Sequence, residues 1–175
     1  EITLLYSAGR DLLSTLDLDE IYEIFYSKAM EVIPCDSMII SRYESKNEKI
    51  YCKAAWVEST KHDSTDFPPL NLGPDYKGTQ AEAIVTGSSI IVNNFYDLIK
   101  DRKDKFLIDD KGNIIKDKDS AVLIDNDSQI TRSALYIPMK LGRNVIGVIS
   151  VFSFKENAYN EYHLKLLESI SVNLS

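Results

Sequence analysis

The chain has 175 residues, of which 44% are hydrophobic and 27% charged, with a formal net charge of -7. This length and composition are typical of one globular domain that buries a core without disulfide bonds. A pI near 4.9 argues against a nucleic-acid-binding surface, which needs a basic stripe. No apolar run approaches the roughly 18 residues of a membrane span. We therefore expect a soluble, cytoplasmic protein without nucleic-acid or membrane partners.

Residues 1–16 predict a first helix with a narrow apolar stripe, of the kind used for a partner helix. The stripe consists of Ile2, Leu5, Gly9, Leu12 and Leu16. Asp17 is a candidate N-cap for the next helix, with Glu20 completing a capping-box pattern. The apolar face of this second helix runs to Ile33, and Pro34 ends it.

The next segments predict a hairpin, a loop, a helix and a third strand. Residues 37–43 and 50–56 read as paired strands, and in the second strand Ile50, Cys52, Ala54 and Trp56 alternate with the residues between them. Residues 58–75 read as a loop because of their Pro and Gly. A helix is expected from Thr79, in the capping-box pattern Thr79-Gln80-Ala81-Glu82, to Gly87, followed by a strand over 89–93.

The C-terminal part predicts a long insertion and then a closing sheet and helix. Residues 98–131 are highly charged and are expected to be mostly solvated, with a small hairpin around Gly112-Asn113. Two strands over 132–139 and 145–152, joined by residues 141–144, are apolar on both faces, so they belong to a sheet covered on both sides. A helix over 160–175 closes the chain, which begins without Met and is expected to come from a longer polypeptide.

The order of these motifs resembles a GAF domain, the small-molecule sensory module of signalling proteins. The resemblance covers nearly the whole chain. It is carried by the Leu-Asp-Leu-Asp-Glu-Ile start of the second helix, Cys35-Asp36 before the first strand, Gly78 and Gly87 around a helix that precedes Ile90-Ile91-Val92-Asn93, and the segment from Ser133 to Leu174. It implies a single α+β domain (GAF/PAS-like) over 1–175, with a central antiparallel sheet of five to six strands. Terminal helices would cover one face, and loops and helices would enclose a ligand pocket on the other.

Such a pocket would combine apolar walls with a few polar anchors. The candidate ligand-binding residues are aromatic or small and polar, near the middle of the sheet and the start of the crossing helix: Tyr43, Trp56, Tyr76, Thr79, Asn93, Asp97, Ser133 and Tyr136. In the alternative interpretation the aromatic residues are core and Thr79 is only a helix cap.

Catalytic and metal signals are weak, so we expect no metal, no bound cofactor and no catalysis. His62 and His163 lack metal-ligand spacing with Cys or carboxylates, and no hydrolase or phosphate-binding motif occurs. The Asp-rich insertion lacks the spacing of a calcium loop. Cys35 and Cys52 lack CxxC spacing and are expected to be reduced, buried thiols, with a disulfide between them as the alternative.

GAF domains with known ligands can be compared with this chain residue by residue. Bilin-carrying members attach the pigment through a Cys near a His, and no Cys follows Cys52. Haem would need His62, which reads as a solvated loop residue. Asn94, Phe95 and Asp97 match only part of the signature of cyclic-nucleotide-binding members. Free methionine sulfoxide reductases present cysteines at the pocket, a pattern from which this chain departs.

The resemblance implies a non-catalytic sensory domain of a bacterial-type signalling protein, such as a histidine kinase of a two-component system, a cyclic-dinucleotide enzyme or a transcription regulator. An unidentified small molecule would bind, and the terminal helices would relay the signal and pair in a homodimer. Two alternatives stay open: a ligand-free dimerisation or linker module, and a free methionine sulfoxide reductase.

Overall fold

A computed structural model of the chain describes residues 17–72, 78–99, 106–108, 114–116 and 130–174. Its helices and strands, in chain order, are α2 (Leu18–Val32), β1 (Ser37–Glu44), β2 (Lys49–Val57), β3 (Thr60–His62), the 3-10 helix η1 (Ser64–Asp66), β4 (Leu70–Asn71), α3 (Thr79–Thr86), β5 (Ile90–Val92), α4 (Phe95–Ile99), β6 (Phe106–Ile108), β7 (Ile114–Lys116), β8 (Ser133–Leu141), β9 (Asn144–Ser153), α6 (Glu161–Ser171) and the 3-10 helix η2 (Val172–Leu174).

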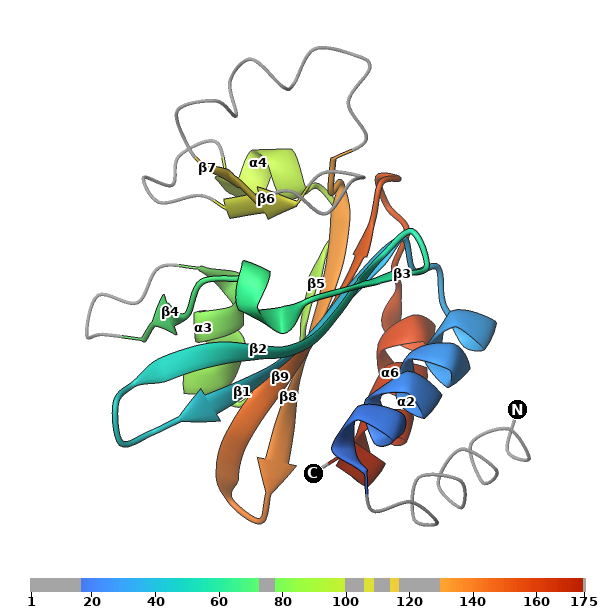
Figure 1. The fold of residues 1–175 in the computed structure, drawn as a ribbon. Helices are drawn as coiled ribbons and strands as arrows, with labels where there is room; N and C mark the ends of the chain where they lie inside the picture. The colour runs from blue at the N-terminus through green and yellow to red at the C-terminus, as the bar shows by residue number, and fades with distance from the viewer. Residues whose placement is uncertain (1–16, 73–77, 100–105, 109–113, 117–129, 175) are drawn as a thin grey trace.

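An antiparallel sheet forms the centre of the fold (Figure 1). In the described part of the chain it has seven strands, in the order β3-β2-β1-β9-β8-β5, with β4 paired to β2. The α+β class predicted from the sequence is confirmed, although the sheet has more strands than expected. The extra strands come from residues 58–75, which contain β3, η1 and β4 rather than only a loop.

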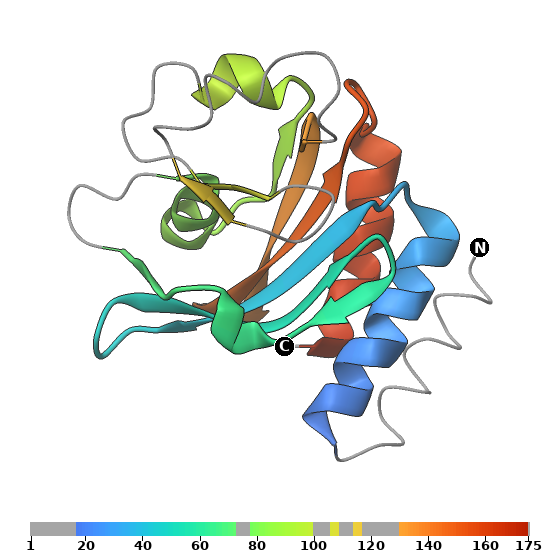
Figure 2. The ribbon, with the colours of Figure 1, turned by 45° about the horizontal axis from the view of Figure 1, so that its top comes forward.

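The two long helices pack side by side on one face of the sheet (Figures 1 and 2), as predicted. Asp17 caps α2, because its carboxylate accepts the Asp19 N–H at 2.9 Å, and Pro34 follows the end of the helix. Large apolar side chains from both helices and the sheet fill this side of the core: Phe25, Met38, Ile40, Trp56, Leu135, Ile149, Val151, Leu167 and Ile170. We call this the helix face.

The opposite face of the sheet is covered by α3 and neighbouring short elements (Figure 1), and we call it the α3 face. Its buried cluster joins Ala81, Ala83 and Ile84 of α3 to sheet residues that include Ile39, Ile50, Ala55, Tyr136, Val148 and Phe152. The helix α3 packs directly on β8 and β9. The strands β6 and β7 pair with each other in a separate two-stranded sheet, which confirms the hairpin predicted inside the insertion.

A bulge in β2 changes which side chains share a face. Ile40 pairs with Ala54 but its neighbour Ser41 pairs with Cys52, so Lys53 is an extra residue in β2. One extra residue reverses the inward and outward positions beyond it. The unbroken alternation expected from Ile50 to Trp56 is therefore wrong: Cys52 lies on the α3 face and Trp56 on the helix face.

Local signals at α3 and at the turns behave as expected, with one correction. Gly87 ends α3 in the left-handed conformation, with φ of 62°, and Gly142, with the same φ, lies in the tight turn between β8 and β9. Thr79, however, is the first residue of α3 and not its cap. The N-cap is Gly78, which contributes no side-chain hydrogen bond.

The two helices predicted at the ends of the chain have different outcomes. The first predicted helix, residues 1–16, lies outside the described residues. The closing helix is α6 followed by the 3-10 turn η2, somewhat shorter than the range 160–175 expected from the sequence. No helix of the described residues combines the length and apolar character needed to cross a membrane.

Candidate functional site

Three buried serines of the central strands lie on the α3 face of the sheet. Ser150 of β9 lies between Ile39 and Tyr136 in the registers of its two neighbouring strands, and both partners belong to the α3 face. On β1, Ser37 pairs with Phe152 and Ser41 with Val148 and Cys52, which belong to the same face. The other side of β1 and β9 carries Met38, Ile40, Ile149 and Val151. The buried Ser153 at the end of β9 also lies on that side, and its hydroxyl donates to the Asp36 carboxylate at 2.7 Å.

Two of these hydroxyls have no hydrogen-bond partner among the described residues. The Oγ atoms of Ser37 and Ser150 are both unpaired, although the residues are only 1% and 0% exposed. In α3, the buried Oε1 of Gln80 is also unpaired within the described chain. Leaving such a group unpaired costs about 1–3 kcal/mol. These three atoms therefore mark where a hydrogen-bonding partner would be stabilised.

Helical spacing places Gln80 over the same face. Ala83 and Ile84, one turn after Gln80, belong to the stripe of α3 that packs against the sheet. The sheet contributes the apolar side chains of Tyr136 and Phe152 to this face. Their rings pack edge to face, with 5.9 Å between the ring centroids. This combination of apolar walls and a few polar groups is typical of small-molecule sites.

Three of the residues proposed from the sequence lie on the α3 face. Tyr136 is buried there, Tyr43 pairs with Ile50 and packs against the same cluster, and Thr79 is buried at the start of α3. Tyr76 lies outside the described residues.

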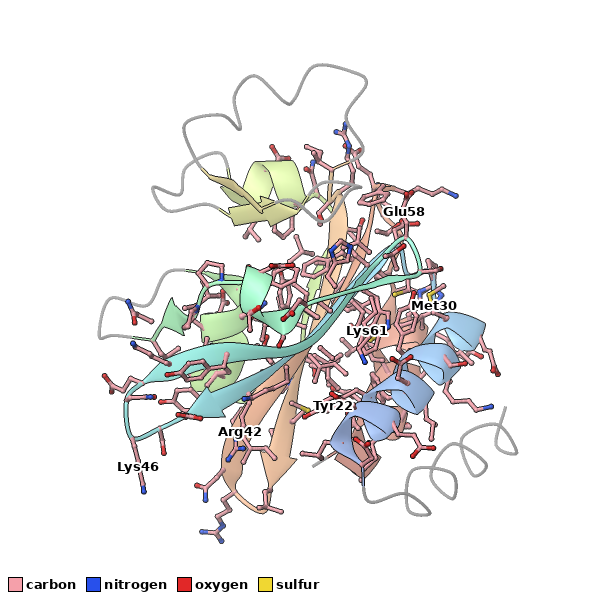
Figure 3. The ribbon with its side chains drawn as sticks, viewed as in Figure 1. Tyr22, Met30, Arg42, Lys46, Glu58 and Lys61 are labelled. Atoms are coloured by element: carbon pink, nitrogen blue, oxygen red, sulfur yellow. The ribbon has the colours of Figure 1, made fainter. Side chains whose placement is uncertain are left out.

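Trp56, by contrast, lies on the helix face and is not part of this arrangement. Its ring stacks on Tyr26 of α2, with 4.5 Å between the ring centroids and 4° between the planes. The Nζ atom of Lys61, which also forms an ion pair with Glu23 of α2, lies 5.8 Å from the Trp56 ring (Figure 3). The bulge at Lys53 explains the difference from the sequence-based expectation.

Asn93 and Ser133 use their polar groups to hold the fold together. The Asn93 Nδ2 atom donates to the Tyr159 carbonyl at 2.9 Å, and its Oδ1 accepts the Tyr159 N–H at 3.2 Å. The Ser133 hydroxyl donates to the Lys155 carbonyl at 2.7 Å and accepts the Ala158 N–H at 3.2 Å. Both residues therefore fix the connection between β9 and α6.

Asp97 is exposed and takes part in a local cap of α4. Its backbone N–H donates to Asn94 Oδ1 at 3.1 Å, and its carboxylate accepts the Asn94 Nδ2–H at 2.8 Å. The α3-face polar atoms that sequence reasoning missed belong to Ser37, Ser150 and Gln80. The available signal was a serine at an inward position of an otherwise apolar strand.

The two cysteines are free and lie on opposite sides of the sheet. Cys35 packs against the helix-face cluster and Cys52 against the α3-face cluster. Burial raises the pKa of each thiol from 9.0 to about 12, so both are protonated at neutral pH. Protonated, buried thiols are poor nucleophiles.

The histidines and acidic residues do not assemble a metal site in the part of the chain that is described. No group of three or more His, Cys, Asp or Glu side chains there could hold an ion. His62 is not a loop residue as expected, because it lies in β3 and pairs with Ala55 at the outer edge of the α3 face.

Comparison with known proteins gives a family match and many similar folds. A GAF domain family model matches residues 15–175. The chain is similar to the GAF domain from an Acinetobacter phosphoenolpyruvate-protein phosphotransferase, with 15% identity and a TM-score of 0.73 over 99% of this chain and 89% of that one. It is also similar to the GAF domain of the corresponding Coxiella burnetii protein, with 11% identity and a TM-score of 0.69 over 99% and 89% of the two chains.

A third similar structure is the free methionine-R-sulfoxide reductase from Neisseria meningitidis in complex with its substrate. It shares 12% identity and a TM-score of 0.66 over 98% of this chain and 83% of that one. At these identities the likeness shows the fold alone. No match was found among curated proteins.

Proposed function

The chain belongs to the GAF domain family, and from that premise we propose that it binds a small molecule on the α3 face and relays binding through α2 and α6. The family supports a sensory or regulatory domain in general. The ligand and the relay are the specific parts of this proposal. The protein to which the domain would report is a signalling protein such as a two-component kinase.

The observation that carries the proposal is the pair of buried hydroxyls on the α3 face, of Ser37 and Ser150, that have no partner among the described residues. A sheet that served only to fill a core would gain stability from alanine or valine at Ser37 and Ser150. A ligand that bonds to these hydroxyls would offset their desolvation, and Gln80 Oε1 on α3 is a further unpaired acceptor. The serines therefore favour a binding face over a self-filled linker module.

We further propose that the domain is not a reductase. Cysteine-dependent reduction of a sulfoxide needs reactive thiols presented at the substrate. Cys35 lies on the helix face, and the Cys52 thiol, although on the α3 face, has its pKa raised to about 12 by burial. Reductase assays with free methionine sulfoxide and dithiothreitol should give the same rate with the wild type as with a Cys35→Ser, Cys52→Ser variant.

A thermal-shift screen tests ligand binding. Nucleotides, amino acids, short carboxylates and nitrogen oxyanions would be added singly to the protein. A compound that binds only the folded state raises the melting temperature, and at a hundred times its Kd it stabilises by about 2.7 kcal/mol.

Variants then locate the binding site of any compound that raises the melting temperature. Ser150→Ala and Gln80→Ala should reduce the shift. Ser171→Ala is the matched control, because Ser171 is a buried serine on α6 whose hydroxyl donates to the Glu168 carbonyl at 2.8 Å. A shift that survives both site variants would place binding elsewhere. The absence of any shift at millimolar concentrations would favour the ligand-free linker module.

A further inference from the structure

Side-chain hydrogen bonds on either side of the edge strand β5 join it to α6 and to the segment that leads into α6. Just before β5, the Ser89 hydroxyl donates to the Glu168 carboxylate at 2.6 Å, a short charge-assisted bond in a partly buried place. Just after β5, Asn93 forms its two hydrogen bonds with the backbone of Tyr159, which precedes α6.

The order of these two connections sets the relative direction of β5 and α6. Ser89, just before β5, is bonded to Glu168 near the end of α6, and Asn93, just after β5, is bonded to Tyr159 just before α6. Strand and helix therefore run antiparallel between two fixed points, and neither can slide along the other without breaking one connection.

The link between α3 and Ser89 is short and internally bonded. Only Gly87 and Ser88 separate α3 from Ser89. The Thr86 hydroxyl donates to the Glu82 carbonyl at 2.8 Å and accepts the Ser88 N–H at 3.2 Å. Gly87 holds the left-handed conformation that sets the direction of the chain. We therefore expect a displacement of α3 to move Ser89 as well, because the connection between them is short and held by hydrogen bonds.

We propose that β5 couples α3 to α6, with Ser89 and Glu168 as the positioning residues that transmit a displacement of α3 to the closing helix. The proposal rests on the proposed function, in which α3 forms one wall of the ligand site. It assigns the output to α6 in particular, because the side-chain bonds beside β5 go to α6 and to the segment before it, whereas the ion pair between α2 and the sheet lies at the other edge. There Lys61 of β3 forms its ion pair with Glu23 at 2.7 Å.

Hydrogen exchange tests the coupling without any ligand. Gly87→Ala perturbs the end of α3, because a Cβ is strained at a φ of 62° although it meets no close backbone. We expect the amides of α6 to exchange roughly three- to tenfold faster in this variant, with a smaller change in α2.

The same substitution is then repeated in three backgrounds. Ser89→Ala removes the bond to Glu168. In this background, Gly87→Ala should accelerate the exchange of the α6 amides no more than that of the α2 amides. Ser89→Thr keeps the hydroxyl and should restore the response. Glu23→Ala removes the bond at the opposite edge of the sheet and should leave the response unchanged.

Equal acceleration in α2 and α6 would show only a general loss of stability and would overturn the proposal. So would an α6 response that persists in Ser89→Ala. If Gly87→Ala does not fold, Thr86→Val perturbs the same connection by removing both hydrogen bonds of its hydroxyl. Because the measurement needs no ligand, its failure is distinguishable from a failure of the ligand screen.

Discussion

Buried serines of two kinds occur in this sheet. Ser133 and Ser150 are both 0% exposed and lie on adjacent strands. The Ser133 hydroxyl is fully used by backbone groups, whereas the Ser150 hydroxyl has no partner among the described residues. The same side chain thus stabilises the fold at one position and carries a desolvation cost at the other.

This contrast predicts opposite effects of the same substitution. Ser150→Ala should leave the free energy of unfolding unchanged or raise it by up to about 1 kcal/mol, because it removes an unpaired hydroxyl. Ser133→Ala should lower it by about 2 kcal/mol, because it leaves buried backbone groups unpaired. Urea denaturation of both variants measures the difference. Equal losses would mean that Ser150 is satisfied in the folded protein and would remove the main support for a ligand on this face.

The thiols give a prediction that depends on pH. Their folded-state pKa lies near 12, above the unfolded value of 9.0, because burial disfavours the thiolate. Their contribution to stability is therefore complete below pH 9 and is lost as the pH rises toward 12. The double variant Cys35→Ala, Cys52→Ala should lose less stability over this window than the wild type.

Alkylation provides an independent measurement of the same property. At neutral pH, iodoacetamide should modify the native protein far more slowly than the urea-unfolded protein. Rapid labelling of either cysteine in the native state would contradict the assigned burial and would reopen the question of a reactive thiol.

At the scale of elements, local sequence signals predicted three helix ends correctly, although the cap expected at Thr79 was wrong. Asp17, Pro34 and Gly87 mark helix ends, and the structure confirms each position. The bulge at Lys53 could not be predicted in this way, because a bulge is defined by the register between two strands and not by the residues of one. That single unpredicted feature placed Trp56 on the opposite face from the one expected.

The sequence predicted only part of the candidate site, because the pairing of polar side chains also depends on contacts between distant segments. Tyr43 and Tyr136 lie in strands that the sequence predicts, and both are on the α3 face. Asn93 and Ser133 have the composition of ligand anchors, but their hydrogen bonds go to segments distant in sequence. Which polar groups remain unpaired depends on the whole fold, so the sequence alone could not separate Ser150 from Ser133.

The pairing of β1 with β9 predicts one position where even a methyl group is too large. A Cβ at Gly147 would overlap the Ser41 carbonyl oxygen and the Met139 methyl group, and the carbonyl belongs to the backbone of the neighbouring strand. Gly147→Ala should therefore destabilise by about 3 kcal/mol or more. Gly142→Asn is the control, since nothing lies near that position and Asn tolerates a positive φ. An unfolding midpoint unchanged by Gly147→Ala would disprove the register of this pair.

At the scale of the whole molecule, the start of α2 and the end of α6 lie at the same end of the helix layer (Figures 1 and 2). Each carries an exposed apolar side chain there: Leu18 is 63% exposed, and Val172, directly after α6, is 72% exposed. The apolar stripe predicted from the sequence of residues 1–16 immediately precedes Leu18 in the chain. We therefore propose that this end of the helix layer is where two copies of the domain pair.

Sedimentation velocity over a range of concentrations measures the pairing. We expect a monomer–dimer equilibrium for the wild type, weakened about tenfold or more by Leu18→Glu combined with Val172→Glu, since each position loses apolar burial in the dimer. Val85→Glu is the matched control, because Val85 is 51% exposed but lies on α3, at the opposite face of the sheet. A wild type that stays monomeric at high micromolar concentration would contradict the proposal. Equal weakening by Val85→Glu would mean that the copies associate through general exposed apolar surface and not through the terminal helices.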